Sequence, residues 1–463
     1  YDSIVDYFKK KGSRILEPKG ASDPDLGAAS LVVLGPNQIV PVAPAAREAG
    51  FDLTVRENPW SKEKVIGVFQ AKSKREVDDA FPKIFHYGKY SELAFDQGRN
   101  VWKAAQAGDR GTIREVSKPA AAVDVSALKD LPDVIGKVAD RKIVYVGESH
   151  DRFSHHVMEL EVIKGLQGKG KKLAIGMEMF QRPSQGALDD FIAGKFDEKE
   201  MLRRTEYFRR WKFDYRLYRP ILEFARARKI PVVALNARTE IVEKVARGGL
   251  DSLSEEEKKE LPSGMDFSDH AYRERLEKVF QEHKSFPGGK FDYFLAAQVI
   301  WDETMAQSVD EFLRQNPETQ MVALAGAGHL AFGSGIPKRA FRRGGYSYAV
   351  LLNDTDPEKG IADYILYPGP VAFEESPKMG VFLGEENGQV VIQGFSHESP
   401  AEKAGMKKGD VILSLDLAPV QKVEDARIEM AFREKEKAVK VRVLRKEGPG
   451  NDQEMQFEVV PGK

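Results

Sequence analysis

The sequence contains no cysteine, and this absence removes several kinds of chemistry at once. Disulfide bonds, thiolate zinc sites, iron–sulfur ligation and cysteine nucleophiles are all excluded. Any metal ion or haem must therefore be held by histidine, tyrosine, methionine or carboxylate side chains.

Long apolar runs and an excess of one charge are also missing. No stretch approaches the roughly 18 consecutive apolar residues of a membrane helix, which excludes a spanning segment within this chain. The 71 Lys and Arg residues almost cancel the 72 Asp and Glu residues. This balance argues against a nucleic-acid binder held by phosphate contacts over its whole surface, so we expect no nucleic-acid partner.

The composition is that of an ordinary globular protein, with 41% hydrophobic and 31% charged residues in 463. At about 150 residues per domain, this length predicts about three domains. The chain starts with Tyr1-Asp2-Ser3 and has neither an initiator Met nor a leader-like segment. We therefore expect a processed form or part of a longer chain.

The first domain is predicted over residues 1–118. It has strand-like runs followed by a helical stretch, at 30–34, 51–55, 64–69 and 74–83. A Lys-Pro-Ala-Ala-Ala segment at 118–122 has the composition of a linker. We expect a small α/β accessory domain in which His86 and Tyr87 are structural.

The second domain is predicted over residues 119–372. Short, nearly unbroken apolar runs alternate there with helical periods, at 142–146, 172–176, 230–235, 321–325 and 346–352. Such runs fit strands buried on both faces, and the alternation predicts a mostly parallel, doubly wound α/β sheet. Two helical excursions, at 197–229 and 250–285, predict a helical cap. The second contains Ser254 followed by Glu257, the pattern of a capping box.

Polar side chains follow four strands of the predicted sheet. Glu148 and His150 follow the first strand, Glu178 the second, Asn236 the third and His329 the fourth. The carboxyl ends of parallel strands meet at one edge, where ligands bind. We therefore expect Glu148, His150, Glu178 and His329, here called the rim cluster, to form a site with Asn236 beside it.

Two chemistries remain open for the rim cluster. Its carboxylates and imidazoles can activate a water molecule as catalytic acids and bases. Alternatively, His150, Glu178 and His329 can hold a divalent metal ion with an open position. His155 and His156, on the first turn of the next predicted helix, are candidate peripheral ligands. Both chemistries are hydrolytic, and the sequence has no Gly-x-Ser-x-Gly elbow to support a serine esterase.

A dinucleotide site is a weaker alternative in the same region. Residues 326–331, Gly-Ala-Gly-His-Leu-Ala, formally match the Gly-rich fingerprint after a strand. However, Gly333, Gly335 and Pro337 interrupt the helix whose amino end would hold the pyrophosphate. We therefore do not expect a bound dinucleotide.

The first excursion carries a candidate surface for a flat ligand. Residues 203–228 include eight Arg, and four aromatic residues keep helical spacing, at Tyr207, Trp211, Tyr215 and Tyr218. Such a stripe, flanked by guanidinium groups such as that of Arg210, can stack on an anionic ring system. The pattern also fits a helix that packs its aromatic residues inward, and both interpretations stay open.

Four motifs together resemble the ChaN-like haem-binding lipoproteins of the Tiki superfamily, over about residues 120–370. The motifs are Gly147-Glu148-Ser149-His150 with His155-His156, Met177-Glu178-Met179-Phe180, Trp301-Asp302-Glu303-Thr304-Met305-Ala306 and Gly326-Ala327-Gly328-His329-Leu330. The resemblance implies a bacterial extracytoplasmic protein of the periplasm or cell surface, with a role in haem or iron uptake and a membrane anchor outside this chain.

The same resemblance implies a cofactor and an assembly. Members of the family bind haem through a tyrosine and can form a homodimer around it. Tyr207, Tyr215 and Tyr218 are the candidate ligands because they lie in the cap beside Arg residues. The wider superfamily also contains metal-dependent proteases and erythromycin-esterase-like hydrolases, whose motif residues correspond to the rim cluster.

The last predicted domain, residues 373–463, is β-rich, with strands near 390–394, 411–415 and 439–444. Residues 399–406, Ser-Pro-Ala-Glu-Lys-Ala-Gly-Met, followed by Lys-Gly-Asp-Val-Ile at 408–412, resemble a PDZ domain of the bacterial protease type. A PDZ groove takes an extended peptide as an added strand and captures its terminal carboxylate. The capturing loop is expected at Met379, Gly380, Val381 and Phe382.

Two main hypotheses follow, together with a third in which the rim cluster has no function. The first is an extracytoplasmic haem- or iron-binding protein that recruits a peptide through its PDZ domain. The second is a peptidase or esterase that uses the rim cluster, either directly or through a divalent metal ion. The third is a scaffold. Whether the chain is an enzyme stays open at this point.

Overall fold

The computed structural model describes residues 1–13, 23–35, 49–88, 90–104, 125–282, 290–446 and 452–462. The chain divides into two compact units, Tyr1–Pro119 and Ala120–Lys463. The predicted linker at 118–122 and the boundary at 118 lie outside the described residues, and the boundary at 372 stays a prediction.

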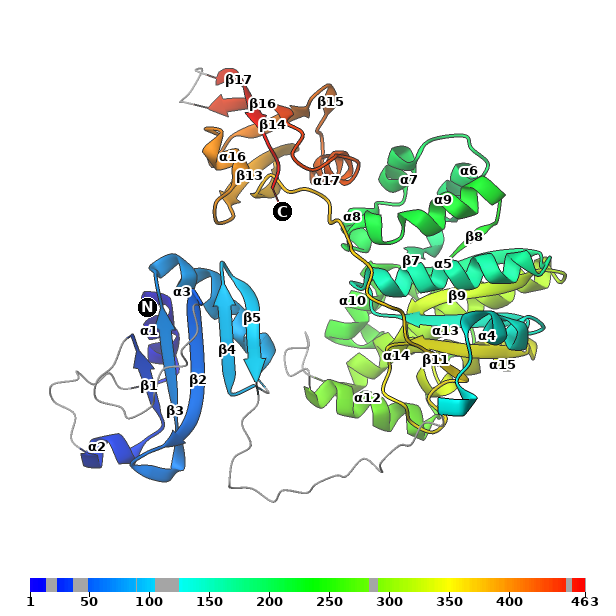
Figure 1. Cartoon of the computed structure of the whole chain (residues 1–463), viewed down its shortest axis with the longest axis horizontal. Helices are drawn as coiled ribbons and strands as arrows, with labels where there is room; N and C mark the ends of the chain where they lie inside the picture. The colour runs from blue at the N-terminus through cyan, green and yellow to red at the C-terminus, as the bar shows by residue number, and fades with distance from the viewer. Residues whose placement is uncertain are drawn as a thin grey trace. The chain divides into compact units, whose positions relative to one another are not determined.

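The first unit is built on a five-stranded mixed sheet in the order β1-β3-β2-β4-β5 (Figure 1). Its elements are α1 (Asp2–Lys10), α2 (Asp23–Ala28), β1 (Leu31–Leu34), β2 (Phe51–Asn58), β3 (Ser61–Ala71), α3 (Lys74–Ala80), the 3₁₀ helix η2 (Phe81–Tyr87), β4 (Glu92–Asp96) and β5 (Arg99–Ala104). Helix α3 begins where the Ser73 hydroxyl accepts the Glu76 amide, and it ends where Pro82 enters η2. The small α/β domain is confirmed.

The second unit contains a six-stranded sheet in the order β11-β10-β6-β9-β7-β8. Every pair in it is parallel. The strands are β6 (Ile143–Glu148), β7 (Leu173–Gln181), β8 (Val232–Asn236), β9 (Gln320–Gly326), β10 (Tyr348–Asn353) and β11 (Tyr364–Leu366). The doubly wound sheet is confirmed, and the short edge strand β11 is an addition to the expected set.

Alternate residues of these strands face two different hydrophobic cores. Val144 and Ile175 pack under α4 (Leu131–Val138), α5 (Phe153–Gly168), α6 (Gln185–Ile192) and α9 (Arg219–Arg228). Tyr145 and Ala174 pack on the other face against α13 (Phe291–Gln315) and α15 (Ile336–Gly344). The strands are buried on both sides, which explains their unbroken apolar sequence.

The first excursion is helical but does not form one continuous helix. It consists of α7 (Glu198–Arg204), α8 (Tyr207–Arg210), the 3₁₀ helix η5 (Tyr215–Leu217) and α9, and we call residues 198–218 the cap segment. Lys212 has a positive φ of 71°, and the Asp214 carboxylate caps η5 by accepting the Arg216 amide. The predicted single stripe of Tyr207, Trp211, Tyr215 and Tyr218 is therefore wrong, because the helix breaks after α8.

The second excursion follows α10 (Thr239–Gly248) and holds the 3₁₀ helix η6 (Leu250–Ser252), α11 (Glu255–Lys258) and α12 (His270–Glu282). The predicted capping box is present, since Ser254 and Glu257 exchange side-chain and backbone hydrogen bonds. Residues 283–285 of this excursion lie outside the described residues.

The last part of the chain folds around an antiparallel sheet in the order β12-β13-β14-β16-β17. Its elements are β12 (Val381–Glu386), β13 (Gln389–Phe395), α16 (Pro400–Lys403), β14 (Val411–Leu415), β15 (Ala418–Pro419), α17 (Val423–Ala431), β16 (Val439–Lys446) and β17 (Asp452–Val459). Strand β12 lies at an edge of this sheet, and no other strand in the described part of the chain pairs with its outer side.

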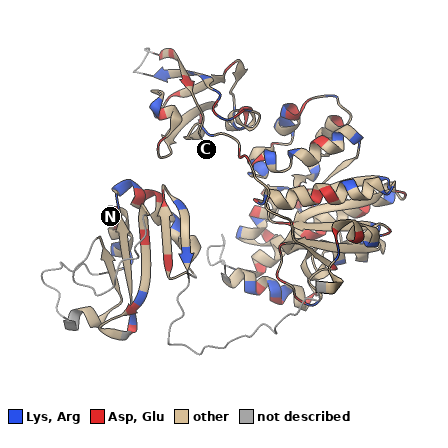
Figure 2. Ribbon diagram, in the orientation of Figure 1, with Lys and Arg blue, Asp and Glu red and all other residues tan. Residues whose placement is uncertain are grey.

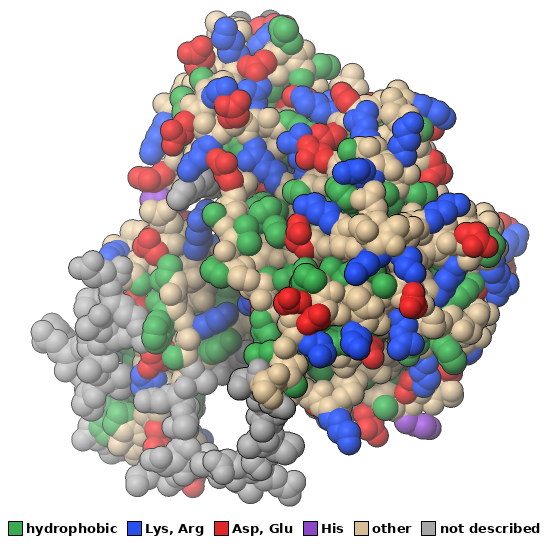
Figure 3. All heavy atoms as spheres, turned by 45° about the vertical axis from the view of Figure 1, so that its right-hand side comes forward, with side chains coloured by type: hydrophobic (Ala, Val, Ile, Leu, Met, Phe, Trp, Pro, Cys, Tyr) green, Lys and Arg blue, Asp and Glu red, His purple; other side chains and the backbone are tan. Residues whose placement is uncertain are grey.

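Charges of both signs are mixed along the described helices and strands (Figure 2). The face drawn in Figure 3 shows the same mixture of acidic and basic side chains, interrupted by small apolar patches. Among the described residues, no helix is long and apolar enough to cross a membrane.

A buried charge cluster joins α13 to α15 and gives a first prediction. Glu303, with a fully buried side chain, lies 2.6 Å from Arg342 and 2.7 Å from Arg343. Glu303→Ala should lower the free energy of unfolding by about 3 kcal/mol, because the partner guanidinium groups lose their carboxylate. Urea denaturation measures this loss. Glu311→Gln, on the exposed side of the same helix, is the control and should change stability by less than about 1 kcal/mol.

Candidate functional site

The structure brings the four members of the rim cluster together. Glu148 is the last residue of β6, His150 follows it, and Glu178 lies inside β7. His329 lies on α14 (Ala327–Leu330), a single turn that directly follows β9. This turn is too short to serve as the phosphate-binding helix of a dinucleotide site. Gly333, Gly335 and Pro337 predicted this interruption of the helix.

His329 is held between two carboxylates. Its Nδ1 lies 2.6 Å from Asp302 Oδ1, and its Nε2 lies 3.6 Å from Glu178 Oε1. The other oxygen of Glu178 accepts the Gly326 amide at 2.7 Å, and the second Asp302 oxygen accepts the Tyr272 hydroxyl at 2.6 Å. These bonds fix both carboxylates, so the His329 ring has one defined orientation.

His150 forms the opposite side of the cluster. Its Nδ1 is hydrogen-bonded to Glu148, and within the described residues Nε2 makes no hydrogen bond. A Cβ on Gly326 would lie 3.0 Å from the His150 ring and 3.6 Å from Glu178, so the missing side chain leaves room for both. The His150 side chain is 31% exposed, and the rings of Trp211 and Phe213 lie 4.7 Å and 5.1 Å from it.

His156 contributes a buried, neutral pair behind the rim. Its Nε2 faces the His150 carbonyl at 3.3 Å, so Nε2 carries the proton and donates. Its Nδ1 then accepts from Glu159, whose pKa burial raises well above the usual range. His156 supports the backbone of His150 and does not face the opening.

His155 is also buried and held by two partners. Its Nδ1 accepts the Ser149 amide at 3.0 Å, and its Nε2 donates to Asp354 at 3.1 Å. Burial lowers its pKa. The prediction that His155 and His156 are peripheral ligands is wrong for this arrangement, since the ring nitrogens of both are already occupied.

Burial and neighbouring charges shift the protonation of the rim cluster. Burial raises the pKa of Glu148 to about 7. Burial opposes a charge on His150 and on His329, but the carboxylates of Glu148 and Glu178 raise the pKa of His150. Glu178 and Asp302 raise the pKa of His329 to about 9. At neutral pH the site therefore holds a charged His329 and a Glu148 close to half protonation.

The predicted tyrosine ligands do not fit haem in this arrangement. Tyr207, Tyr215 and Tyr218 are almost completely buried. Tyr215 donates to Glu198 at 2.7 Å and Tyr218 to the His150 carbonyl at 3.1 Å. Burial raises the pKa of all three, which opposes the tyrosinate that would bind iron.

Arg210 is also occupied, whereas His150 offers an alternative ligand. Arg210 forms ion pairs with Glu206 and Glu240 and contacts Gln181 at 2.7 Å. By contrast, His150 has one nitrogen held by a carboxylate, the other nitrogen open, and two aromatic rings beside it. A carboxylate behind the ring is the usual arrangement of a metal-binding histidine, so His150 is a candidate haem ligand.

The predicted divalent-metal site has no preformed ligand set. Among the described residues, no group of three or more His, Asp or Glu side chains is placed to hold a metal ion. The carboxylates and imidazoles of the rim cluster contact one another or the backbone instead. Asn236 likewise donates to the Glu178 carbonyl at 2.9 Å and positions the end of β7.

Sequence reasoning missed Asp302 and Phe213 as members of the site. Asp302 is 1% exposed on α13, a helix whose buried residues are mostly apolar. A charged residue in such a helix needs a partner, and that signal was available in the Trp301-Asp302-Glu303 motif. Phe213 follows the break after α8, and its contact with His150 depends on the path of the chain there.

The predicted peptide-binding residues lie at the start of β12. Met379 and Gly380 form the preceding loop, whereas Val381 and Phe382 are the first residues of the strand itself. The Met379 carbonyl accepts the Ala401 amide, and the Gly380 carbonyl accepts the Ser396 amide. Gly380 has a φ of 75°, which favours glycine, and Phe382 is 60% exposed.

Helix α17 lies beside β12 in the last part of the chain. The Val423 amide at the start of α17 donates to Glu385 near the end of β12 at 3.1 Å. Met430, near the end of α17, shares a core with Met379. The helix and the strand therefore run in opposite directions. Strand β12 is the edge strand of its sheet.

Comparison with known families agrees with this architecture. Residues 134–340 match the family described as "Haem-binding uptake, Tiki superfamily, ChaN", and residues 377–459 match the PDZ domain family. The resemblance to both families is confirmed.

Individual relatives are distant. Protein RETICULATA-RELATED 5, chloroplastic, of Arabidopsis thaliana is 27% identical over 264 residues, which cover 52% of this chain and 36% of that protein. The ChaN structure of Campylobacter jejuni, with cofacial haem, is 16% identical with a TM-score of 0.43, and the match covers 51% of this chain and 91% of that one. The HtrA3 PDZ domain bound to a phage-derived ligand is 18% identical with a TM-score of 0.16, and the match covers 18% of this chain and 84% of that one.

The Asp302–His329 pair gives a second prediction. The folded pKa of His329, about 9, exceeds its ordinary value of 6.5, so its protonation stabilises the fold below about pH 6.5. This contribution is lost as pH rises through 9. Asp302→Asn should lower the NMR titration midpoint of His329 by about one unit or more. The stability difference from wild type should shrink above pH 9, and an unchanged midpoint would contradict the assigned pair.

Proposed function

We propose that this chain, in which a ChaN-type haem-binding uptake domain is followed by a PDZ domain, binds haem or a related flat iron ligand at His150 and recruits a protein C-terminus. The observation that carries the proposal is the state of the His150 ring. One nitrogen is held by Glu148, the other is open, and Trp211 and Phe213 lie beside the ring.

Each neighbour has a defined part in the proposed binding. Glu148 orients the His150 ring and increases the basicity of its open nitrogen, as a carboxylate behind a ligating histidine does. Trp211 and Phe213 supply apolar ring surface for a flat macrocycle. Tyr218 and His156 hold the His150 backbone carbonyl in place. Bound haem would supply a redox-active iron.

The PDZ part supports recruitment of a peptide. An exposed edge strand offers backbone groups to an added strand, and β12 is such an edge. The loop ahead of it is held by hydrogen bonds to the Met379 and Gly380 carbonyls. We propose a protein C-terminus as the partner and, following the family, a homodimer around haem.

The compartment is part of the same proposal. The family description names haem uptake, and we propose an extracytoplasmic setting with a membrane anchor outside this chain. The name of the Arabidopsis relative places that protein in the chloroplast, which makes a plastid the competing location. Fractionation of the source cells with an antibody to this chain would decide between them.

A second candidate function is acid–base hydrolysis at the rim cluster. The observation that favours it is the pair of perturbed groups in one partly exposed site, Glu148 with a pKa of about 7 and His329 with a pKa of about 9. Carboxylates and imidazoles with separated pKa values are typical of general acids and bases. In this reading Glu178 would take a proton from water and His329 would stabilise the charge that develops.

Haem titration tests the first function. His150→Ala should abolish the Soret shift seen when haem is added to wild type, because the open nitrogen is lost. Glu148→Gln should weaken haem binding by about tenfold, because the ring loses its orienting carboxylate. Absorption spectroscopy with equilibrium titration measures both effects.

The matched control is His86→Ala, which removes an exposed histidine from the first unit. It should leave the titration unchanged. If His150→Ala binds haem as wild type does while Tyr215→Phe does not, the ligand is a tyrosine and the assignment of His150 is wrong.

Turnover measurements test the second function. Glu178→Gln should reduce hydrolysis of a p-nitrophenyl ester or of a fluorogenic peptide by about 100-fold or more, because the general base is lost. Glu178→Gln should leave haem binding at His150 in place, which separates the two functions. Wild-type turnover no faster than that of Glu178→Gln would rule the hydrolase out for these substrates.

A further inference from the structure

Helix α17 belongs to two hydrophobic cores at once. Ala426 and Met430 pack inside the PDZ sheet. Ile428 and Ala431, which are almost fully buried, pack instead into the core of the ChaN-type domain under the cap segment. At 100° per residue, these two pairs lie on opposite sides of the helix, so α17 is clamped between the domains.

Ion pairs join the Asp425 and Glu429 side of α17 to the cap segment. Glu429 is 8% exposed and lies 2.6 Å from Lys199 and 3.6 Å from Arg203, both on α7. Arg203 also pairs with Asp425 at 3.3 Å. Partly buried pairs in a network hold their geometry better than single surface pairs, so this face specifies the orientation of α17.

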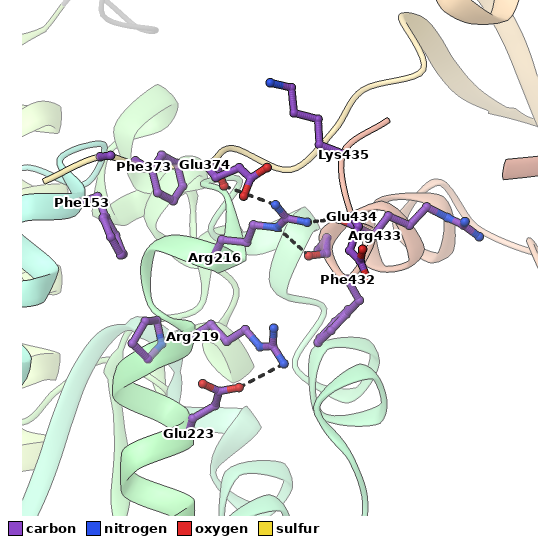
Figure 4. Close-up of a pocket in the computed structure, with 13 residues that line it drawn as sticks. Phe153, Arg216, Arg219, Glu223, Phe373, Glu374, Phe432, Arg433, Glu434 and Lys435 are labelled. Atoms are coloured by element: carbon purple, nitrogen blue, oxygen red, sulfur yellow. Dashed lines mark hydrogen bonds and ion pairs between the residues drawn. The ribbon is translucent and has the colours of Figure 1, made fainter. Parts of the chain in front are cut away.

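Arg216 closes the junction at the carboxyl end of α17. Its guanidinium, on η5, donates to the carbonyls of Ala431 and Arg433 and to those of Glu374 and Glu375 in the segment before β12 (Figure 4). Beside it lies a cavity of about 670 Å³. The hydrogen bonds of Arg216 therefore hold this end of the helix together with the apolar contacts of Ala431 and Phe432.

The same cap segment also holds His150. Trp211 and Phe213 pack on its ring, and the Tyr218 hydroxyl donates to its carbonyl. Tyr215 lies between these residues in the chain, and its ring centroid is 5.8 Å from that of Phe432, the residue directly after α17. A stretch of eight residues, 211–218, thus contacts the rim on one side and the PDZ helix on the other.

We propose that α17 links the peptide groove to the rim: a peptide bound between β12 and α17 stabilises the cap segment around His150. This inference rests on the proposed peptide recruitment. A peptide that packs against α17 favours the orientation that the cap already holds, so the two events support each other. By reciprocity, a ligand at the rim that orders the cap also strengthens peptide binding.

The test uses the full chain and a peptide selected against it from a phage-displayed library of random C-terminal heptapeptides. Adding the peptide should slow amide hydrogen exchange in residues 148–156 and 207–218, measured by mass spectrometry. Lys199→Glu should weaken peptide binding by about fivefold in fluorescence anisotropy, because α17 is held less firmly. It should also remove the slowing at 148–156.

A charge-conserving variant separates the loss of the ion pair from the loss of the Lys199 side chain. Lys199→Arg keeps a cation beside Glu429 without adding one beside Arg203, so both peptide affinity and slowed exchange should stay close to wild type. Lys408 is an exposed residue in the loop before β14. Lys408→Glu is the matched control and should behave as wild type.

The outcomes distinguish two failures. If no peptide can be selected, the proposed peptide recruitment fails and the linkage fails with it. If the peptide binds wild type and Lys199→Glu equally and leaves exchange at 148–156 unchanged, recruitment stands and the linkage alone is overturned. Loss of binding in Lys199→Arg to the same extent as in Lys199→Glu also overturns it, because the charge at position 199 then does not decide the affinity.

Discussion

The cost of burying carboxylates at the carboxyl edge of the parallel sheet controls the architecture around it. Glu178 lies within a strand that is buried along its whole length, so water cannot stabilise its charge. The chain compensates with a backbone amide from β9 and with His329, which is itself held by Asp302 from α13. Three separate segments are thereby fixed relative to one another by one side chain. The same requirement explains why His150 and Glu148 pair on the opposite side.

These pairings also decide which chemistry the site favours. A preformed metal site needs several ligands aimed at one point, whereas here each carboxylate is aimed at a neighbouring imidazole or amide. Among the described residues of the rim cluster, His150 Nε2 is left without a hydrogen bond, and the rings of Trp211 and Phe213 lie beside it. The proposed haem binding would use this nitrogen and this apolar surface, and the site also keeps the raised pKa values of Glu148 and His329.

The sequence predicted the sheet well because its strands are buried on both faces and carry unbroken apolar runs between helical periods. It also placed Glu148, His150, Glu178 and His329 correctly, since the ends of parallel strands must meet at one edge. The aromatic spacing in the cap was misleading. Helical periodicity persists across Lys212 although the backbone turns there, and spacing alone cannot reveal a positive φ. Asp302 was signalled locally as a charged residue in a buried helix, but its pairing with His329 and the contact of Phe213 with His150 depend on the packing of distant segments.

Helix α17 also bears on what counts as a domain in this protein. By sequence it belongs to the PDZ module, yet two of its side chains complete the core of the preceding domain. A boundary drawn between the two families would therefore cut through a shared hydrophobic core. Separating them exposes apolar surface on both pieces, so the two should melt as one cooperative unit. In this respect the two modules share one folding unit, and replacing either of them would remove part of a shared hydrophobic core.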